Sequence, residues 1–194
     1  LQQRGDLQRL GDGSVWFLAF NFDPGRVTSN WHLRKALQLV TDPSELVNRI
    51  IKMPGNLPGE SLFPVWLQGI DGFFRQEYPA PQITLDADAA REHLRLAMEE
   101  LGLDEPPSLA LWVDDTPGAG RQAEYFQNLY GTQLGIDIRI DRQIFKQRLA
   151  KMQNQDFDLA TYGWGPDFAD PLTFGELFAS WNPNNNGRFS NQAY

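Results

Sequence analysis

The sequence predicts an α/β fold, because helical and strand patterns alternate regularly along the second half of the chain. Two segments, 86–101 and 120–134, carry apolar residues at helical spacing, and each is followed at once by a glycine that can end a helix. A shorter helix is expected at 143–152. Three segments have the pattern of buried strands, at 108–113, 136–140 and 157–162. This alternation is typical of layered folds in which ligands bind where strands end and loops begin.

The first half of the chain predicts one buried strand followed by two helices in series. Residues 15–21 are aromatic and almost continuously apolar, as expected of a strand that is buried on both faces. Residues 31–40 repeat apolar side chains at helical spacing, and Ser29 or Asn30 can cap this helix. A second helix is expected to start at Thr41-Asp42-Pro43, because an aspartate before a proline is a typical helix start.

Residues 53–82 interrupt these patterns with many prolines and glycines and with several aromatic residues. A loop of this length inside a domain is unusual and tends to be functional or to cover another surface. Two interpretations stay open at this point. The segment is either an ordered surface wrap with buried anchors or a ligand-facing loop.

The composition fits a globular protein and argues against several classes of function. With 194 residues and 41% hydrophobic content, residues 1–194 are expected to form a single domain. The net charge of -8, from 25 acidic and 17 basic residues, disfavours nucleic acid as a partner. No stretch is apolar for long enough to predict a transmembrane segment, and no cysteine is present for a disulfide or a thiolate site.

The two histidines, His32 and His93, are expected on solvated helix surfaces. Because Leu1 is not preceded by a methionine or a signal sequence, we expect a mature piece or an excised fragment.

The most informative stretch is 162–171, which combines aromatic, acidic, glycine and proline residues directly after an expected strand. Trp164 offers a flat apolar face with one N–H donor, although core packing is the alternative. Gly163 and Gly165 would let a ligand backbone come close, or would merely permit a turn. Asp167 offers a fixed negative charge, with an Asx-turn or a helix cap as the alternative.

Paired carboxylates leave an enzyme interpretation open. Asp167 with Asp170, or Asp114 with Asp115, would be the acid pair of a glycosidase. Asp170 is, however, the expected start of the next helix, because Pro171 follows it. Leu172, Phe174 and Leu177 are expected to point inward from that helix. The chain has no P-loop, G-x-S-x-G, H-E-x-x-H or EF-hand motif. We therefore expect no catalytic residue, no metal site and no cofactor.

Five stretches of the sequence, taken in order, match the signature of one known family. They are a strand with two helix starts, an alanine-rich helix, a Gly-Ile turn, a Phe-Asp strand leading into Gly-Trp, and an asparagine-rich loop, at 16–43, 88–94, 133–138, 157–164 and 182–194. On these stretches the chain resembles the C-terminal lobe of the extracytoplasmic solute-binding proteins of family 5, which deliver oligopeptides and dipeptides to ABC transporters. The Trp-Gly-Pro-Asp sequence at 164–167 favours the oligopeptide branch.

The resemblance implies a type II periplasmic binding protein fold, in which a mixed β-sheet is flanked by helices. Family members are about two to three times as long, so the other lobe and the C-terminal end are expected to be absent from this chain. The implied location is extracytoplasmic, either in the periplasmic space or lipid-anchored on the outer face of the cell membrane. The implied partners are an oligopeptide ligand and the permease subunits of an ABC transporter, and we expect a monomer.

The resemblance also implies a set of binding residues. Asp167 matches the aspartate that takes the α-amino group of the peptide, and a buried ammonium group needs such a carboxylate because it costs several kcal/mol without a partner. The full set of candidate ligand-binding residues is Thr161, Tyr162, Gly163, Trp164, Gly165 and Asp167. The residues that meet the peptide carboxylate in some family members fall near Met152 and Ala119, so Lys151 and Arg121 are the neighbouring cations that could replace them.

Two other binding interpretations stay open beside the oligopeptide one. A relative with the same fold could bind a dipeptide, a metal chelate, haem, a sugar or an opine, although Asp167 argues mildly against a metal or haem ligand. The same lobe could also be the ligand-sensing domain of a regulator. In the main interpretation two lobes close over an extended peptide without changing it chemically.

Overall fold

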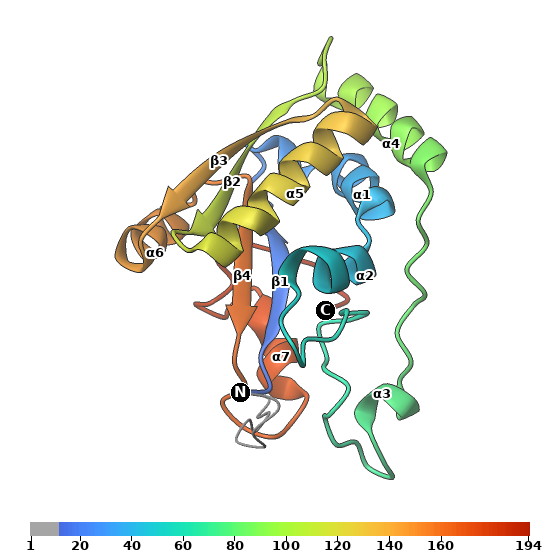
Figure 1. The fold of residues 1–194 in the computed structure, drawn as a ribbon, viewed down its shortest axis with the longest axis vertical. Coiled ribbons are helices and arrows are strands. Elements are labelled where there is room, and N and C mark those ends of the chain that lie inside the picture. The colour runs from blue at the N-terminus through green and yellow to red at the C-terminus, as the bar shows by residue number, and fades with distance from the viewer. Residues whose placement is uncertain (1–11) are drawn as a thin grey trace, which may run out of the picture.

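The computed structural model describes residues 12–194, in which four strands form one mixed β-sheet with helices packed on it (Figure 1). The strand order is β1-β4-β2-β3. The strands are β1 Val15–Phe20, β2 Ser108–Asp114, β3 Asp137–Gln143 and β4 Leu159–Trp164. β1 runs antiparallel to β4, whereas β2 runs parallel to both β4 and β3. The predicted α/β class, with a mixed sheet flanked by helices, is therefore confirmed.

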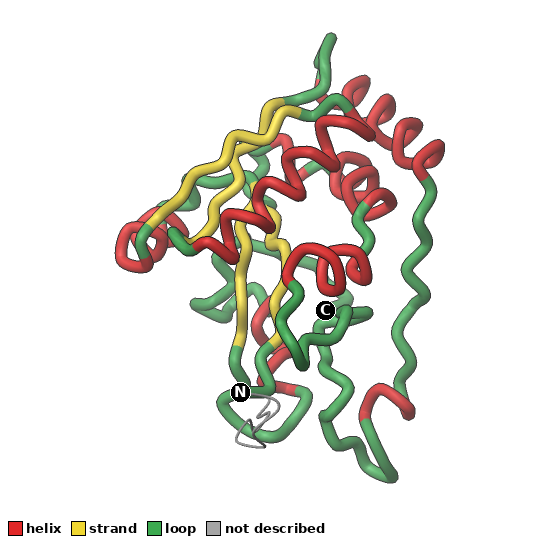
Figure 2. Tube along the Cα trace, in the orientation of Figure 1, coloured by secondary structure: helices red, strands yellow, loops and turns green. Residues whose placement is uncertain are grey.

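Helices alternate with the strands along the chain (Figure 2). The longer ones are α1 Trp31–Val40, α4 Ala87–Leu101, α5 Pro117–Leu134 and α6 Phe145–Gln153. The short helical segments are η2 Val27–Ser29, α2 Pro43–Glu45, η3 Leu46–Ile51, α3 Phe74–Glu77, α7 Leu172–Gly175 and η4 Glu176–Phe178. The second predicted helix thus begins as α2 and continues as the π-helix η3. None of the helices within residues 12–194 is long and apolar enough to cross a membrane.

Local signals set the helix ends. Asn30 Oδ1 accepts a hydrogen bond from the backbone N–H of Leu33 at the start of α1, and the carboxylate of Asp86 caps α4 in the same way. The glycines predicted to end α4 and α5 do so in the left-handed conformation. α5 begins earlier than predicted, because Thr116 caps it and Pro117 takes the first helical position.

The main core lies between one face of the sheet and the helices α1, α4 and α5. Its strand residues are fully buried and include Leu109, Leu111, Val113 and Leu159. The opposite face carries a smaller cluster, in which Trp112 and Ala160 pack against Met152 and Phe157. Successive side chains of a strand point to opposite faces, and burying each large apolar one stabilises the fold by roughly 1.5–3 kcal/mol. β2 and β4 therefore anchor both layers of the fold.

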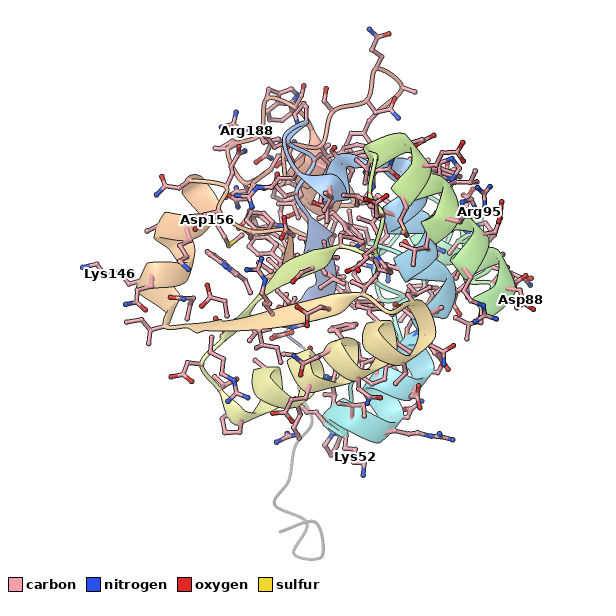
Figure 3. All side chains as sticks on the ribbon, turned by 90° about the horizontal axis from the view of Figure 1, so that it is seen from above. Lys52, Asp88, Arg95, Lys146, Asp156 and Arg188 are labelled. Atoms are coloured by element: carbon pink, nitrogen blue, oxygen red, sulfur yellow. The ribbon has the colours of Figure 1, made fainter. Side chains whose placement is uncertain are left out.

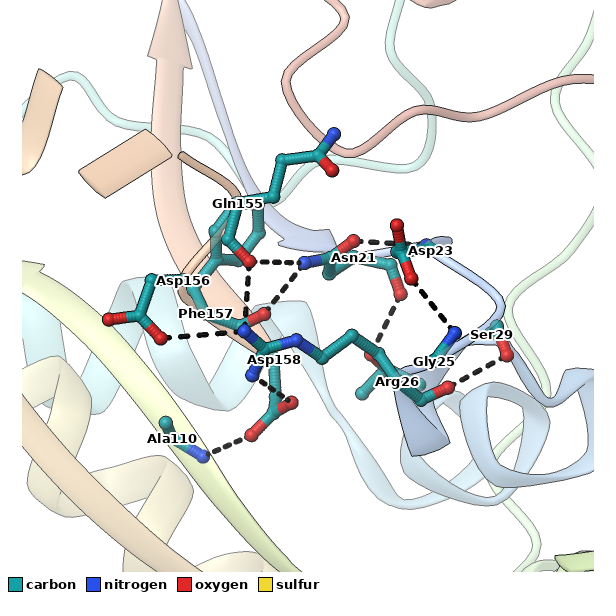
Figure 4. A network of polar contacts seen from close by, with 11 residues as sticks. Asn21, Asp23, Gly25, Arg26, Ser29, Ala110, Gln155, Asp156, Phe157 and Asp158 are labelled. Carbon is teal, nitrogen blue, oxygen red and sulfur yellow. Dashed lines mark hydrogen bonds and ion pairs between the residues drawn. The ribbon is translucent and has the colours of Figure 1, made fainter. Parts of the chain in front are cut away.

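A polar network around Asn21 fastens the end of β1 to the start of β4 (Figure 4). The fully buried side-chain amide of Asn21 donates hydrogen bonds to the carbonyl oxygens of Gln155 and Phe157 at 3.0 and 2.9 Å. Its backbone N–H donates to the carbonyl of Asp158 at 3.0 Å. The carboxylate of Asp158 accepts from the backbone N–H of Ala110 at 2.8 Å, which ties β2 to the same point. The network thus fixes where β4 begins relative to both of its neighbours.

Arg26 covers the solvent side of this network. Its guanidinium lies 3.4 Å from the carboxylate of Asp156 and 3.5 Å from that of Asp158, and it donates to the carbonyl of Gln155 at 3.0 Å. Gln155 has a φ of 56°, in the left-handed region that side chains rarely adopt. Its carbonyl accepts from both Asn21 and Arg26, and these contacts hold the turn before β4 in that conformation.

The long segment between η3 and α4 is a surface wrap with a buried anchor. Leu67 is fully buried, and Trp66 packs edge-on to Phe174 of α7 with ring centroids 6.2 Å apart. Phe63 and Phe74 pack against each other with ring centroids 5.0 Å apart. The buried Leu67 fits the interpretation of a surface wrap with buried anchors, and the ligand-facing interpretation stays a prediction.

Glu77 orders the tip of this segment. Its carboxylate accepts hydrogen bonds from the backbone N–H groups of Ile70, Asp71 and Gly72, at 3.1, 2.9 and 2.8 Å. The bond from Ile70 is the largest cause of a pKa for Glu77 below its ordinary value. One charged side chain thereby holds three consecutive amides that would otherwise have only water as a partner.

We expect the substitution Asn21→Ala to destabilise the protein by about 1–3 kcal/mol, because it leaves the buried carbonyl of Phe157 without its amide donor, whereas the carbonyl of Gln155 keeps Arg26 as a donor. Urea unfolding followed by circular dichroism measures this loss. Asn128→Ala is the matched control, since Asn128 is exposed on α5, and it should change the free energy of unfolding by less than about 0.5 kcal/mol. Equal losses in the two variants would show that the network does not fasten the strands.

Candidate ligand-binding site

The stretch singled out in the sequence begins inside β4 rather than after it. β4 ends at Trp164, two residues later than the predicted end, because the ladder with β1 pairs Trp16 with Gly163 and Val15 with Trp164. The predicted end of the strand at residue 162 was therefore two residues too early. Thr161, Tyr162, Gly163 and Trp164 are held in the sheet, and Gly165 is the first residue beyond it.

One edge of β4 is open at this end. β2 pairs with β4 only at Leu159 and Ala160, whereas β1 pairs along the whole strand. At Gly163 and Trp164, the edge that faces away from β1 has no strand beside it within residues 12–194. An open edge of this kind exposes backbone donors and acceptors that can pair with another extended chain.

The side chains of β4 point alternately to the two faces of the sheet. Thr161 Oγ1 donates a hydrogen bond of 3.4 Å to the carbonyl of Trp112. Tyr162 lies on the opposite face, in edge contact with Phe17 at a centroid distance of 5.5 Å. Trp164 is half-buried, and its indole N–H is buried without a hydrogen-bond partner among the residues described. Trp164 is therefore neither a fully exposed shelf nor a satisfied core residue.

The space in front of Gly163 is filled by Trp16. A Cβ atom on Gly163 would lie 2.7 Å from the ring of Trp16, so the indole rests flat on the backbone of β4. The predicted close approach of a ligand to Gly163 is thus blocked on that face by a side chain of this protein. At Gly165, a Cβ atom would only meet Ser14 Oγ at 3.4 Å.

Trp16 is a candidate site residue that sequence reasoning missed. It is 67% exposed although it is a tryptophan in a strand, and it lies directly across the ladder from Gly163. The sequence placed it in a strand buried on both faces. Only the register between β1 and β4 could have revealed that it covers the candidate site, and that register is not readable from the sequence.

The loop after β4 carries Asp167 at the surface. The backbone N–H of Asp167 donates to the buried hydroxyl of Thr173 at 3.0 Å, which ties the loop to α7. The carboxylate of Asp167 makes no hydrogen bond or ion pair with any residue between 12 and 194, so it forms neither the Asx-turn nor the cap considered as alternatives. Pro166, next to it, lies close to Gly13.

Asp170 has the structural role that the sequence predicts. Its Oδ1 accepts a hydrogen bond of 2.8 Å from the backbone N–H of Leu172 at the start of α7. Phe174 and Leu177 are buried as predicted. The expectation that Leu172 also points inward was wrong, because α7 is a single turn and this residue lies on its outer side, 57% exposed.

The two cations proposed for the carboxylate end of a ligand differ sharply in their surroundings. Lys151 Nζ lies 2.6 Å from the carboxylate of Asp141 and 5.1 Å from the ring centre of Trp112. Burial raises the pKa of Asp141, but hydrogen bonds from Lys151 and Gln143 and the charge of Lys151 outweigh it and hold that pKa below its ordinary value. Arg121, in contrast, is exposed in the second turn of α5 and makes no ion pair with the described part of the chain.

Topology brings Arg121 and Asp167 to the same end of the sheet. β2 and β4 run parallel, so their carboxyl ends lie at one edge (Figure 1). α5 follows the carboxyl end of β2, and the Asp167 loop follows that of β4. Lys151 lies in the last turn of α6, and its ion pair with Asp141 neutralises it.

A cavity of about 500 Å³ lies elsewhere, between the turn before β4 and the C-terminal segment. None of the candidate site residues lines it. The asparagine-rich part of this segment forms turns, as the sequence predicts. The side-chain amide of Asn185 donates to the carbonyls of Phe178, Ala179 and Phe189 at 2.8–3.2 Å.

Comparison with known proteins places this geometry in a family. The family described as bacterial extracellular solute-binding proteins, family 5 (middle region), matches residues 2–186. The dipeptide-binding protein of Lactococcus lactis subsp. cremoris is 30% identical over 174 residues, covering 89% of this chain and 31% of the relative. The oligopeptide-binding protein OppA of Bacillus subtilis is 25% identical, covering 96% of this chain and 34% of the relative. This chain thus spans about a third of the length of the curated relatives it matches.

Solved structures show the same fold. Listeria monocytogenes OppA bound to peptide has a TM-score of 0.86 and 29% identity, covering 94% of this chain and 37% of that chain. The substrate-binding domain of an oligopeptide ABC transporter from Bacillus anthracis has a TM-score of 0.86 and 31% identity, covering 94% and 36%. The expected type II periplasmic binding protein fold is therefore confirmed.

We expect Gly163→Ala to destabilise the protein by about 1–2 kcal/mol, because the added Cβ displaces the ring of Trp16. Gly165→Ala is the matched control and should cost much less, since its Cβ makes only an ordinary contact. Combining each change with Trp16→Ala in a double-mutant cycle, measured by urea unfolding, isolates the contact. If Gly163→Ala costs the same with and without Trp16, the indole does not rest on this glycine.

Proposed function

The chain belongs to the bacterial extracellular solute-binding proteins of family 5, and from this premise we propose that it is the ligand-binding lobe of an oligopeptide-binding protein. The whole protein captures extended peptides and delivers them to the permease subunits of an ABC transporter. Relatives named as oligopeptide- and dipeptide-binding proteins support this proposal. The observation that carries it is the exposed carboxylate of Asp167, which has no partner among residues 12–194, at the end of an open strand edge.

In this proposal residues 1–194 form one domain, the C-terminal lobe, and the rest of the parent protein supplies the second lobe. The chain spans about a third of its curated relatives, which supports a lobe rather than a whole binding protein. Two lobes are needed because a site that buries most of its ligand needs walls on both sides. The parent works as a monomer outside the cytoplasm, in the periplasmic space or lipid-anchored, and it binds its ligand without changing it chemically.

Asp167 is the proposed partner of the peptide α-amino group. An ammonium group that enters a closed cleft loses its hydration and needs a charged acceptor in exchange. The carboxylate of Asp167 can be this acceptor, since no side chain of the described region neutralises the carboxylate and the backbone N–H of Asp167 is bonded to Thr173. An exposed carboxylate held on a fixed loop is accessible to an incoming ligand.

The open edge of β4 sets the direction of the bound peptide. Because β4 runs toward Asp167, a peptide whose amino end meets this residue and whose backbone lies along β4 runs antiparallel to the strand. Main-chain hydrogen bonds at Gly163 and Gly165 then hold peptides of many sequences, since they do not depend on side chains. Trp164, Tyr162 and Thr161 complete this wall of the site.

The same edge limits how far the peptide can follow β4. β2 occupies the edge at Leu159 and Ala160, so the peptide must leave the strand where β2 ends. Two residues after β2 ends, α5 begins, and it carries Arg121 in its second turn. Arg121 is therefore the better proposed partner for the peptide carboxylate, whereas Lys151 is already paired with Asp141.

Asp167→Asn in the full-length protein should weaken binding of peptides with a free amino terminus about 10–100-fold, because a charge-assisted hydrogen bond is lost. N-acetylated versions of the same peptides should lose far less affinity. Isothermal calorimetry measures both. Asp170→Asn is the control, since its side-chain oxygen keeps its bond to Leu172 and binding should not change. Equal losses for free and acetylated peptides would remove Asp167 from this role.

Arg121→Gln in the full-length protein should weaken binding of peptides with a free carboxylate about tenfold, and of C-terminally amidated peptides much less. Lys146→Gln makes the same change of charge on the exposed side of α6 and should leave both affinities unaltered. If Lys151→Gln weakened binding only of peptides with a free carboxylate, and Arg121→Gln had no such effect, Lys151 rather than Arg121 would be the partner of the peptide carboxylate.

A further inference from the structure

The two histidines of the chain meet between α1 and α4, although the sequence places both on solvated surfaces. His32 Nδ1 and His93 Nδ1 are 2.8 Å apart, and both rings are half-buried. Trp31 packs edge-on to both rings, at centroid distances of 4.9 and 5.3 Å. Charged residues of α4 such as Asp88 and Arg95 lie on its outer side instead (Figure 3). The prediction that both histidines lie on solvated helix surfaces was wrong, because it could not include the packing of α4 on α1.

The geometry of this pair fits a shared proton rather than a metal ion. The ring centroids are 5.0 Å apart, so the two rings point at each other nearly along the line that joins their Nδ1 atoms. A metal ion about 2.0–2.1 Å from each nitrogen would require both lone pairs to converge on a point beside that line. Within residues 12–194, no group of three or more histidines, aspartates and glutamates is arranged to hold a metal ion.

Glu100 favours one arrangement of the protons on the two rings. Its Oε1 lies 3.7 Å from His32 Nε2, and its Oε2 accepts a hydrogen bond of 2.7 Å from Asn30. The carboxylate favours a proton on His32 Nε2, so in the neutral pair His32 Nδ1 is the acceptor and His93 Nδ1 is the donor. The pair then makes one hydrogen bond with no net charge.

Proton uptake has opposite effects at its two steps. A first proton leaves one Nδ1–H facing one Nδ1 lone pair, so the contact stays and becomes charge-assisted. A second proton places an N–H on both sides of the contact, which removes the acceptor and opposes two positive charges. Lys35 on α1 adds to that repulsion, whereas Glu92 and Glu100 on α4 offset part of it.

We propose that His32 and His93 form a proton-sharing latch between α1 and α4, which stays closed with no proton or one bound and opens when a second proton binds. The latch makes the packing of α4 on α1 sensitive to the acidity of the surroundings. It joins two helices that cover the main core. It is independent of the proposed peptide site, because none of its residues belongs to that site.

The direction of the pH effect follows from His93. Its burial is the largest cause of a pKa below the ordinary value, and the charges of His32 and Lys35 lower it further, against the opposite effect of Glu92. The unfolded chain therefore binds a proton at this residue more readily than the folded chain does. Stability is fully present above the unfolded pKa of about 6.5 and falls as the pH drops below it toward the lowered folded pKa.

An NMR titration of the imidazole signals in the 194-residue chain tests the latch directly. The chain contains only these two histidines, so the range from pH 7.5 to 5 isolates them from the carboxylates. We expect two macroscopic pKa values separated by at least about one unit. In His32→Gln and in His93→Gln, the remaining histidine should titrate in a single step that lies between them. Two equal pKa values in the wild type, unchanged in the variants, would overturn the proposal.

Thermal unfolding provides the second readout. Between pH 7.5 and 5 the wild-type melting temperature should fall about 2–4 °C further than that of His93→Gln, which keeps a hydrogen-bond donor for His32 but takes up no proton. Glu100→Gln should increase the drop in melting temperature between pH 7.5 and 5, because the carboxylate that favours the singly charged histidine pair is lost. Parallel curves for wild type and His93→Gln would show that the second proton does not open the contact.

Discussion

The buried amide of Asn21 is the constraint on which the sheet depends. It joins the end of β1 to the chain just before β4, and Asp158 extends the same tie to β2. Strand pairing has a period of two residues, so a slip of one residue at this point would turn every side chain of β4 to the wrong face. The position of Trp16 over Gly163, the open edge beyond Ala160 and the exposure of Asp167 all follow from the register that this network sets.

The candidate site combines a rigid part with an open part. The rigid part is β4 itself, which is held by β1 along its length and continues into a loop fastened to α7 through Thr173. The open part is the far edge of β4 together with the carboxylate of Asp167. A binding surface of this kind loses little conformational entropy when a ligand docks, because its own atoms are already fixed. In the proposed function the fold therefore supplies a preorganised surface, and the backbone of the bound peptide pairs with the open edge of β4.

The helix starts could be predicted from the sequence because each is set by residues that are close together in the chain. Asn30 and Asp86 cap helices through atoms two or three residues away, and Asp170 starts α7 in the same manner, so the sequence alone shows them. The features that escaped prediction depend on partners that are distant in the chain. Gly163 is covered by Trp16, which lies on another strand, and Lys151 forms an ion pair with Asp141. His32 contacts His93 only because α1 and α4 pack against each other. The end of β4 was misjudged for the same reason, because pairing with β1 extends a strand whose own pattern fades.

Glu77 shows how a long connection can be ordered without a core of its own. Three successive amides converge on one carboxylate, an arrangement that proteins elsewhere use to hold phosphate or other anions. Here the anion belongs to the chain, so the shape of the tip is encoded within a few residues and does not rely on the sheet. Changes in the length or sequence of the surrounding connection should therefore be tolerated, because closing a longer loop costs little free energy and the tip is ordered by its own local hydrogen bonds.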